Sequence, residues 1–520
     1  MIQRILHGDN ILYLLYLFLI VFLVFNTGVY SDDFVHIFKK RNMGFSELIL
    51  PSEWWIIAPV EHYLLNVWYR FFDINNLIFL ELLKTFYIII SFFFITRFFR
   101  IFLGVYHASM ISFLILFFPS HEATTYFYLG LYQTLNFALY AYAFYLVYHN
   151  RILSGTIFSV LAAFVCYSSV GFAIALFSFF VMDRKYKKAA VMIVPCLFYI
   201  VHYIYFTKIN PITDSQIPLG LNAYSLVKQF ILQVVTFVDS MIGPSMWYKI
   251  YYSFSNLSLI SVLLAIFLMV VFYRKHGNAE NKEISSKYDF KLIVTFSIII
   301  LAGFANYSIT GRYPQLCFGL GNRTTLYGSI LLSYLIVQCP VSSKIKTGVF
   351  AVLLLSVLGI SDHWKNWSQH QQGVSKMIAA NKKLREYVDP RIIFVSGNQY
   401  SKFGPISHIE FLSESWVPNA VFKLALKKEI SAEPINKLHV YEDGYLINTK
   451  YNTKTEVNDY INVYDSENDR LFALNVEEIN DYIDLLQPEN RHWIMLSDNR
   501  LIRFVKTLVI KLMPRLEYAL

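Results

Sequence analysis

The sequence predicts a mainly α-helical membrane protein, with a bundle of about eleven transmembrane helices and an extracytoplasmic α/β domain at the C-terminal end. Of the 520 residues, 56% are hydrophobic and 18% are aromatic, which is more apolar surface than a soluble domain of this size can bury. The apolar residues come in blocks of about 18 to 25 with few charges, the length that crosses a hydrocarbon core. The composition changes after residue 360, so we divide the chain into a membrane domain, residues 1–360, and a polar domain, residues 361–520.

The apolar blocks define the predicted helices in order. Residues 11–28 follow Arg4 like a signal sequence, but no convincing small-x-small cleavage site comes after them, so we expect an uncleaved first helix. Residues 152–182 are too long for one span, and the polar run Cys166-Tyr167-Ser168-Ser169 near their middle predicts two short helices that meet at the outer face. Other clear blocks are residues 76–95, 101–118, 129–148 and 189–206.

Basic residues indicate the orientation. With the N-terminus in the cytoplasm, the short, strongly basic connections fall inside, as the positive-inside rule requires. The exception is the run from Lys39 to Arg41 in the first outside loop, which is long enough to translocate regardless of charge. The basic residues placed inside are Arg97, Arg100, Arg151, Arg184, Lys185, Lys187, Lys188, Arg274, Lys275, Lys282, Lys287, Lys291, Lys344 and Lys346.

Charge and cysteine content exclude two classes of function. The net charge of +9 is concentrated in these connections, where topology explains it, so nucleic acid is not an expected partner. The four cysteines lie in or beside apolar segments and have no CxxC spacing. Neither a disulfide framework nor a zinc site is therefore expected.

Three long segments are predicted outside the membrane, residues 30–75, 209–256 and 310–322. The apolar and aromatic residues of the first segment are too interrupted for a span, and they favour helices that lie on the membrane surface. Residues 224–238 in the second segment have the same pattern.

The polar domain shows short elements of both kinds. Residues 392–396, 437–441 and 493–496 are typical of strands, and residues 374–388 and 476–486 are typical of helices. Residues 501–516 alternate basic and apolar side chains, which favours a helix that rests on the bilayer.

The most informative residues for function are Asp32 and Asp33, directly after the first predicted span. Two adjacent carboxylates at the membrane surface can act as a general base or hold a divalent cation. Taken alone, such a pair more often simply marks an outside loop.

The next outside loops carry further groups of this kind. His121 and Glu122 follow the third span on the same predicted side, and Glu61 and His62 lie between them and the Asp pair in sequence. Brought together, these side chains would form an acid–base or metal cluster near the membrane face. A lone His or Glu at a helix end is more often a cap or an interfacial side chain.

Two arginines are predicted on the outside late in the membrane domain, Arg312 and Arg323. A guanidinium at the outer boundary of a span can grip a lipid phosphate with two hydrogen bonds. The alternative is that each arginine side chain simply extends to the membrane–water interface. The positive-inside bias works against an outside arginine, which favours a functional role.

An Asp-Asp pair after the first span, followed by an outside loop with His and Glu, resembles the GT-C superfamily of integral-membrane glycosyltransferases. This superfamily includes the protein O-mannosyltransferases, the aminoarabinose transferases of lipid A and many bacterial surface-polysaccharide enzymes. Residues 119–125 leading into Tyr132-Gln133-Thr134-Leu135 are similar to a loop-to-helix passage of the O-mannosyltransferase-like branch, and Asn322-Arg323-Thr324-Thr325 is similar to its late Arg-bearing segment. The resemblance covers residues 1–360 as layout, and the polar domain matches no family.

The resemblance implies an inverting transfer of a sugar from a polyprenyl-phosphate donor to an extracytoplasmic glycan, lipid or protein. Asp32 or Asp33 would deprotonate the acceptor, Glu122 and His121 would orient it, and Arg312 or Arg323 would stabilise the leaving phosphate. Glu61 and His62 would contact substrate. Some relatives use Mg²⁺ or Mn²⁺, for which Asp32, Asp33 and Glu122 are the candidate ligands, and others use no metal. No sequon-recognition motif is present, which argues against transfer to asparagine.

Two other classes fit the pattern of spans. An O-antigen-type polysaccharide polymerase or ligase would use outside arginines and a large late loop, without needing Asp32 and Asp33. A transporter or flippase would need ionisable residues inside the spans, for which Glu81 and Lys84 are the candidates. The residue usage, rich in Phe, Ile, Asn, Lys and Tyr, suggests an A/T-rich genome and a bacterial inner membrane.

Overall fold

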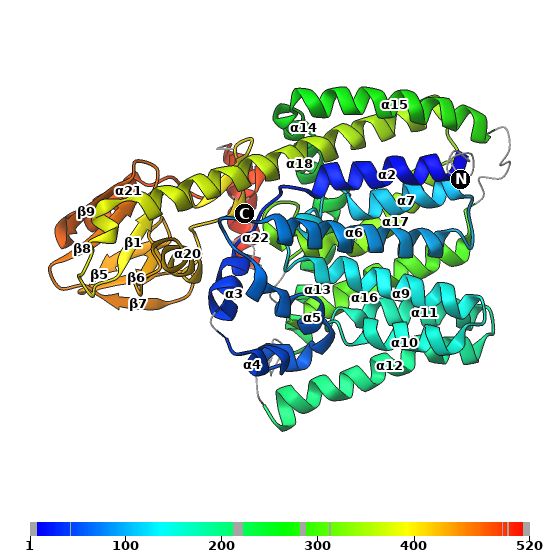
Figure 1. Ribbon diagram of the computed structural model, residues 1–520, viewed down its shortest axis with the longest axis horizontal. Helices are drawn as coiled ribbons and strands as arrows, with labels where there is room; N and C mark the ends of the chain where they lie inside the picture. The colour runs from blue at the N-terminus through cyan, green and yellow to red at the C-terminus, as the bar shows by residue number, and fades with distance from the viewer. Residues whose placement is uncertain are drawn as a thin grey trace.

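The computed structural model describes residues 8–41, 43–211, 222–280, 288–310, 314–490, 492–496 and 499–512. The fold is mainly helical and has a strand-containing region near the C-terminal end. Figure 1 shows the helices packed into a bundle, with the strands set apart at the left. The predicted fold class is thus confirmed as a mainly helical bundle followed by a C-terminal region with strands.

The bundle contains helices suited to a membrane. Among the described residues, five helical stretches are long and apolar enough to cross one, and shorter apolar helices accompany them. The predicted count of about eleven spans is not confirmed. The long stretches are Ile78–Phe99, Tyr186–Ile209, Ala223–Asn256, Phe290–Ile309 and Lys344–Ala380, and the shorter helices are Ile11–Val24, Val105–Leu116, Ile152–Ala163, Ser169–Met182 and Leu259–Phe272.

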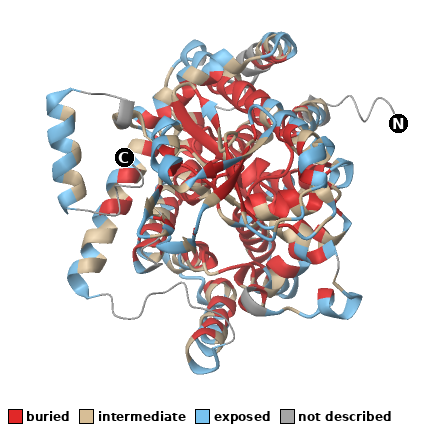
Figure 2. Cartoon of the chain, turned by 90° about the vertical axis from the view of Figure 1, so that its left-hand side faces the viewer, coloured by how far each residue is buried: buried red, intermediate tan, exposed pale blue. Residues whose placement is uncertain are grey.

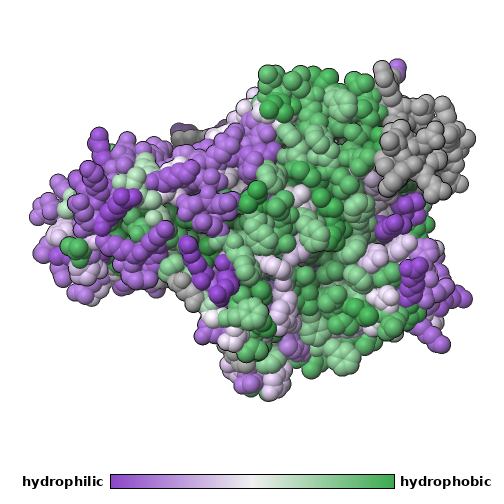
Figure 3. Space-filling model, in the orientation of Figure 1, coloured by the Kyte–Doolittle hydropathy of each residue, from purple (hydrophilic) through white to green (hydrophobic). Residues whose placement is uncertain are grey.

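The outer surface of the bundle is apolar. Large side chains such as Phe86, Phe198 and Leu263 are more than half exposed, although the interior of the fold is densely buried (Figure 2). Figure 3 shows hydrophobic residues over the bundle and hydrophilic residues over the C-terminal region. Because an apolar surface of this extent is unfavourable in water, it indicates a membrane protein.

Helix α9 runs through the bundle, with α6 and α10 packed along it, and α11 packs against both α12 and α16. The prediction of two helices within residues 152–182 is confirmed, because α10 ends at Ala163 and α11 begins at Ser169. The Ser169 hydroxyl closes the turn by donating to the Ala163 carbonyl at 2.9 Å. The helices are α2 (Gly8–Val24), α6 (Ile78–Phe99), α7 (Val105–Leu116), α8 (Ala123–Tyr126), α9 (Leu131–Tyr148), α10 (Ile152–Ala163), α11 (Ser169–Met182), α12 (Tyr186–Ile204), α13 (Ala223–Met241), α14 (Pro244–Ser253), α15 (Leu259–Glu280), α16 (Phe290–Thr310) and α17 (Leu326–Gln338).

Helix α13 departs from the prediction. Residues 224–238 were expected along the membrane surface, but α13 packs against α16 and is part of a stretch, Ala223–Asn256, that is long and apolar enough to cross a membrane. Phe230 and Phe237 both contact the ring of Phe304, with centroid distances of 5.9 and 5.0 Å. These aromatic contacts bury one face of a segment whose polar residues made it appear interfacial.

The first predicted outside loop folds into short helices at the end of the bundle that faces the strands (Figure 1). None of them is long enough to cross a membrane, which agrees with the prediction that residues 30–75 do not form a span. They are α3 (Asp32–Arg41), α4 (Phe45–Ile49), η1 (Glu53–Ile57), α5 (Pro59–Leu64) and η2 (Asn66–Phe71).

Helix α18 (Ser343–Ala380) joins the two parts of the molecule. It runs unbroken through residue 360, where the composition changes, and extends out of the bundle to the strands (Figure 1). The proposed boundary between residues 360 and 361 therefore falls inside a helix.

The C-terminal region contains a mixed four-stranded sheet of order β4-β1-β8-β9, in which β4, β1 and β8 are parallel and β9 is antiparallel to β8. A β2-β3 hairpin and an antiparallel β5-β6-β7 sheet complete it. The strands are β1 (Ile393–Ser396), β2 (Tyr400–Phe403), β3 (Ile406–Glu410), β4 (Ala432–Pro434), β5 (His439–Glu442), β6 (Tyr445–Asn448), β7 (Thr453–Glu456), β8 (Tyr460–Asp465) and β9 (Arg470–Asn475), and the helices are α19 (Lys382–Arg385), α20 (Trp416–Leu426), α21 (Ile479–Leu485) and α22 (Arg500–Leu512), with η6 (Val476–Glu478) and η7 (Trp493–Leu496).

Two of the three predicted strands are confirmed, since β1 and β5 cover most of residues 392–396 and 437–441. The third prediction is wrong, because Trp493–Leu496 is a 3₁₀-helix. Its location explains the difference: the His492 ring lies 2.7 Å from the Asp239 carboxylate, and the Trp493 indole donates to the same group at 3.3 Å. Side-chain contacts with α13 therefore hold this segment, rather than strand pairing.

Candidate active site

Asp32 and Asp33 form the first turn of α3, where the helix faces α20 of the C-terminal region. Acidic residues are favoured here because the unpaired N–H groups and the helix dipole attract negative charge. The Asp33 carboxylate also accepts from the Tyr30 N–H at 3.1 Å, so it closes the turn that begins the helix.

Asp33 is fully buried and held by three donors. Besides Tyr30, the Tyr69 hydroxyl donates to it at 2.5 Å and the Leu129 N–H at 3.2 Å. Burial raises the pKa of Asp33 to about 7, although the hydrogen bonds from Tyr69 and Tyr30 act in the opposite direction. With both oxygens engaged, Asp33 fixes α3 against η2 and the start of α9.

Asp32 is only partly buried, unlike its neighbour Asp33. The Trp416 indole of α20 donates to it at 2.8 Å. Burial raises the pKa of Asp32, and the charge of Arg323 lowers it, while Glu414 raises it further. Asp32 therefore shares its surroundings with a guanidinium from the membrane region and a carboxylate from the C-terminal region.

Glu61 is a second buried carboxylate in this region. It is 4% exposed, and its carboxylate makes no hydrogen bond or ion pair within the described part of the chain. Burial raises the pKa of Glu61 to about 8, and the charge of Arg323 opposes this rise. Glu61 is consequently neutral at pH 7 and can donate a hydrogen bond.

Arg323 lies in the 3₁₀-helix η5 (Leu320–Thr325), just before α17. Its guanidinium carbon is 5.8 Å from the centre of the Phe127 ring, within cation–π range. Because its charge acts on both Asp32 and Glu61, it connects the two carboxylates. Arg312, the other predicted phosphate ligand, lies outside the described residues.

Glu122 lies in a different cluster. Lys249 of α14 contacts both of its carboxylate oxygens at 2.5 and 2.6 Å, and the His408 ring nitrogen Nε2 lies 2.9 Å from one of them. All three side chains are buried. Burial raises the pKa of Glu122, but Lys249 and His408 outweigh this effect and lower it overall. Glu122 is thus an ion-pair partner that joins α14 and β3 to the loop before α8.

His121 and His62 also have local partners. The His121 ring contacts the Thr124 hydroxyl at 2.8 Å, and burial lowers the pKa of His121 to about 4. The His62 ring bonds the Leu48 carbonyl at 3.0 Å and the Asn66 side chain at 2.9 Å. Among the described residues, neither histidine ring contacts Asp32 or Asp33.

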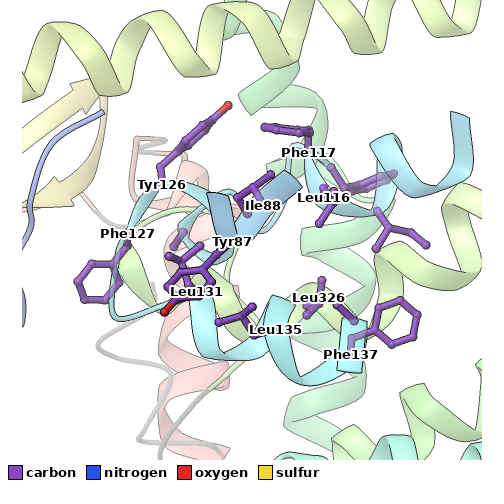
Figure 4. Close-up of a cluster of buried hydrophobic side chains, with 14 of the residues drawn as sticks. Tyr87, Ile88, Leu116, Phe117, Tyr126, Phe127, Leu131, Leu135, Phe137 and Leu326 are labelled. Atoms are coloured by element: carbon purple, nitrogen blue, oxygen red, sulfur yellow. The ribbon is translucent and has the colours of Figure 1, made fainter. Parts of the chain in front are cut away.

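The loop that carries His121 and Glu122 is anchored by apolar side chains. Figure 4 shows Leu116 and Phe117 before this loop and Tyr126 after it, in a cluster with residues of α6, α9 and α17. The Thr325 hydroxyl donates to the Ser120 carbonyl at 2.9 Å, and the Asn322 amide oxygen accepts from the Ala123 N–H at 3.1 Å. These bonds fasten the loop to the segment that carries Arg323.

The predicted metal ligands do not form one site. The oxygens of Glu122 are taken by Lys249 and those of Asp33 by three donors, which leaves Asp32 alone with capacity for a cation. Within the described ranges, no group of three or more His, Cys, Asp or Glu side chains could hold a metal ion. The described residues do not fit a bound Mg²⁺ or Mn²⁺.

Sequence reasoning missed five residues of these clusters, namely Tyr69, Lys249, His408, Glu414 and Trp416. All are distant in sequence from the residues they contact; for example, 384 positions separate Trp416 from Asp32. The one available signal was Lys249, a lone basic residue among the aromatic residues 247–254, within the segment 209–256 that was predicted to be outside.

Comparisons of the chain with protein-family models, with curated proteins and with solved structures find no match.

Proposed function

We propose that the protein is a membrane glycosyltransferase that moves a sugar from a polyprenyl-phosphate donor to an extracytoplasmic acceptor with inversion. The observation that carries this proposal is the convergence of Asp32, Glu61 and Arg323 at the end of the bundle, beneath the C-terminal region. A base, a hydrogen-bond donor and a fixed cation in one place suit nucleophilic displacement of a phosphate leaving group.

In the proposed reaction, Asp32 accepts the proton of an acceptor hydroxyl. The hydroxyl oxygen forms a bond to the anomeric carbon of the sugar while the bond from that carbon to the phosphate oxygen breaks. The electron pair of that bond leaves with the polyprenyl phosphate, whose charge Arg323 stabilises. Asp32 is preferred over Asp33 as the base because it is partly exposed and its carboxylate is less engaged.

The other groups have supporting roles. Asp33 positions α3 through its three hydrogen bonds. Neutral Glu61 donates a hydrogen bond to the donor phosphate or sugar, a contact that a charged carboxylate would oppose. Residues 1–360 would hold the lipid, in a bacterial inner membrane, with the site and the C-terminal region on the extracytoplasmic side.

The residues that would favour transport have another role. Lys84 and Glu81 form a buried ion pair at 3.2 Å, and Lys84 also donates to the Gly28 carbonyl and the Thr27 hydroxyl at 2.8 Å. The Gly28 N–H donates to Glu81 in return at 2.6 Å. These bonds fasten α6 to the end of α2, so they support a structural role more than an ion pathway.

The test is donor turnover by the purified chain in lipid nanodiscs. We expect at least one member of a panel of polyprenyl-phosphate sugars to be hydrolysed or transferred, with release of polyprenyl phosphate detected by mass spectrometry. Nuclear magnetic resonance of the initial product should show the inverted anomer. Turnover of none of the donors, or a retained anomer, would contradict the proposal.

Replacing Arg323 by Lys is expected to lower kcat/KM for the donor about tenfold, because the ammonium cannot grip phosphate with two parallel hydrogen bonds. Arg323→Gln should lower it further, by roughly 100-fold, because the charge is lost. Steady-state kinetics in nanodiscs measure both. The matched control is Arg391→Lys, at an arginine about half exposed beside Asp389; equal effects at the two positions would remove Arg323 from the site.

Donor turnover should depend on pH through the carboxyl group of Glu61. Its pKa of about 8 means that it is protonated at neutral pH and loses its proton as the pH rises through that value. Donor turnover should therefore decline above about pH 8, where a buried negative charge replaces the hydrogen-bond donor. Glu61→Gln keeps a neutral donor and should abolish the decline. An unchanged alkaline decline in this variant would show that another group titrates.

A further inference from the structure

The C-terminal region contains a cavity of about 600 Å³ that lies apart from the residues discussed above. It is formed where β1, β4 and β8 end. These three strands are parallel, so their carboxyl ends meet at one edge of the sheet, and β1 lies between the other two. In open sheets of this kind, ligands bind in the crevice outside the carboxyl ends of the strands.

The segments that follow the three strands supply the lining, namely residues 397–399 after β1, 435–438 after β4 and 465–467 from the end of β8. The turn after β1 is tight: Gly397 has φ +74°, and a Cβ on it would lie 2.7 Å from the Glu467 side chain. Asn398 donates to the Ser466 carbonyl at 2.8 Å, and Gln399 donates to the Ile435 carbonyl at 2.8 Å. The edge of the cavity is thus pre-formed by cross-links among its own loops.

Aromatic rings and neutral polar groups form part of the lining of this cavity. Trp367 of α18, Tyr400 of β2 and Tyr482 of α21 line it together with the side chains of Asn436 and Gln487. One face of Trp367 is stacked on His370 at a centroid distance of 4.8 Å, so its other face is the one left for a ligand. Flat apolar ring faces beside amides and hydroxyls suit a sugar, which has an apolar face of C–H groups and a rim of hydroxyls.

The charges disfavour an anionic ligand. Lys402 and Lys437 line the cavity, but so do Asp465, Glu467 and Glu489. Lys437 is already paired with Asp484 at 3.4 Å, and Lys402 donates to the Ser407 hydroxyl at 3.0 Å. A nucleotide or a free phosphate would therefore meet more negative than available positive charge.

Two aromatic contacts connect the wall of the cavity with helix α3 of the candidate active site. The Trp367 ring is 6.4 Å from that of Phe411, which is 5.7 Å from that of Phe34, the neighbour of Asp33 in α3. All lining residues except Trp367 belong to the C-terminal region, whose surface is hydrophilic in Figure 3, whereas a lipid-linked donor would lie at the apolar surface of the bundle. This placement favours the acceptor over the donor as the source of the sugar.

We propose that the cavity at the carboxyl ends of β4, β1 and β8 binds a neutral saccharide and holds the acceptor glycan beside the active site. The acceptor role rests on the proposed glycosyltransferase function, whereas saccharide binding by the cavity does not.

The test is binding of free tetrasaccharides of mannose, glucose, galactose and N-acetylglucosamine to the full chain in nanodiscs, measured by isothermal titration calorimetry. We expect at least one to bind at millimolar concentrations or better, and uridine diphosphate not to bind. Trp367→Ala and Tyr482→Ala should each weaken binding about tenfold, by loss of a ring contact. The matched control is Tyr445→Ala, at an exposed tyrosine of β6 outside the cavity.

Absence of binding by all four saccharides, or equal affinity of wild type and both cavity variants, would overturn the proposal. Binding of uridine diphosphate in place of saccharide would also overturn it. Since Trp367 contacts Phe411, Tyr482→Ala tests the cavity independently of helix α18. The variant Asp32→Asn separates saccharide binding from glycosyl transfer. Saccharide binding by the cavity should persist in this variant, whether or not the wild-type protein turns over a donor.

Discussion

Replacing Asp32 by Asn is expected to lower donor turnover by roughly 100- to 10,000-fold, the usual contribution of a general base. The amide keeps the shape of the side chain and can still accept a hydrogen bond from Trp416, so the fold should be retained. It cannot take the proton of the acceptor, so the loss should appear in kcat more than in the KM of the donor. Turnover by size-homogeneous protein in nanodiscs measures the effect.

Two further variants show whether the effect is specific to Asp32. Glu47→Gln alters an exposed carboxylate of α4 in the same loop and should leave turnover unchanged. Asp33→Asn weakens a carboxylate that accepts three hydrogen bonds, so it should lower both stability and turnover. Full activity of Asp32→Asn would exclude Asp32 as the base and would favour the polymerase or ligase class, which does not require it.

Replacing Lys249 by Met is expected to lower the free energy of unfolding by about 3 to 5 kcal/mol, the range for breaking a buried ion pair from one side. The apolar side chain fills similar space, but Glu122 would keep a buried charge with only His408 beside it. The Lys249 ammonium also donates to the Cys317 carbonyl, which would lose this partner. Unfolding in mixed detergent micelles measures the change.

A double variant distinguishes a lost charge balance from a packing defect. Glu122→Gln combined with Lys249→Met removes both charges, so it should recover much of the stability. Lys423→Met is the matched control, because its partner Glu429 is 81% exposed, and its effect should be within about 0.5 kcal/mol. A double variant no more stable than Lys249→Met would show that the loss arises from packing.

The sequence predicted features that depend on local pattern. The paired helices α10 and α11 could be predicted because the polar turn around Ser168 interrupts an apolar run of characteristic length. The Asp pair was correctly placed directly after the first apolar helix. The end of α18 could not be predicted from composition, because hydropathy at residue 360 reports where apolar side chains cease, whereas a helix backbone continues as long as its own hydrogen bonds are made.

Features that depend on distant contacts could not be predicted. Glu122 was a candidate catalytic residue because its loop was polar and outside, but its role depends on Lys249, which is 127 positions away. His408 completes the same cluster from a hairpin whose sequence carries no recognised motif. Periodicity and spacing contain no information about which charged groups meet across such separations, so site residues were identified by type and not by partner.

The cluster of Glu122, Lys249 and His408 also bears on how the chain is made. Synthesis proceeds from the N-terminus, so the loop of Glu122 and helix α14 are in place before residue 408 leaves the ribosome. Until then, the ion pair at the end of the bundle lacks its imidazole and the cover that β2 and β3 provide. The bundle can reach its final packing only after the C-terminal region has folded against it. We therefore expect chains truncated before residue 408 to be recognised by membrane quality-control proteases, even though the five long apolar stretches found among the described residues have all been synthesised.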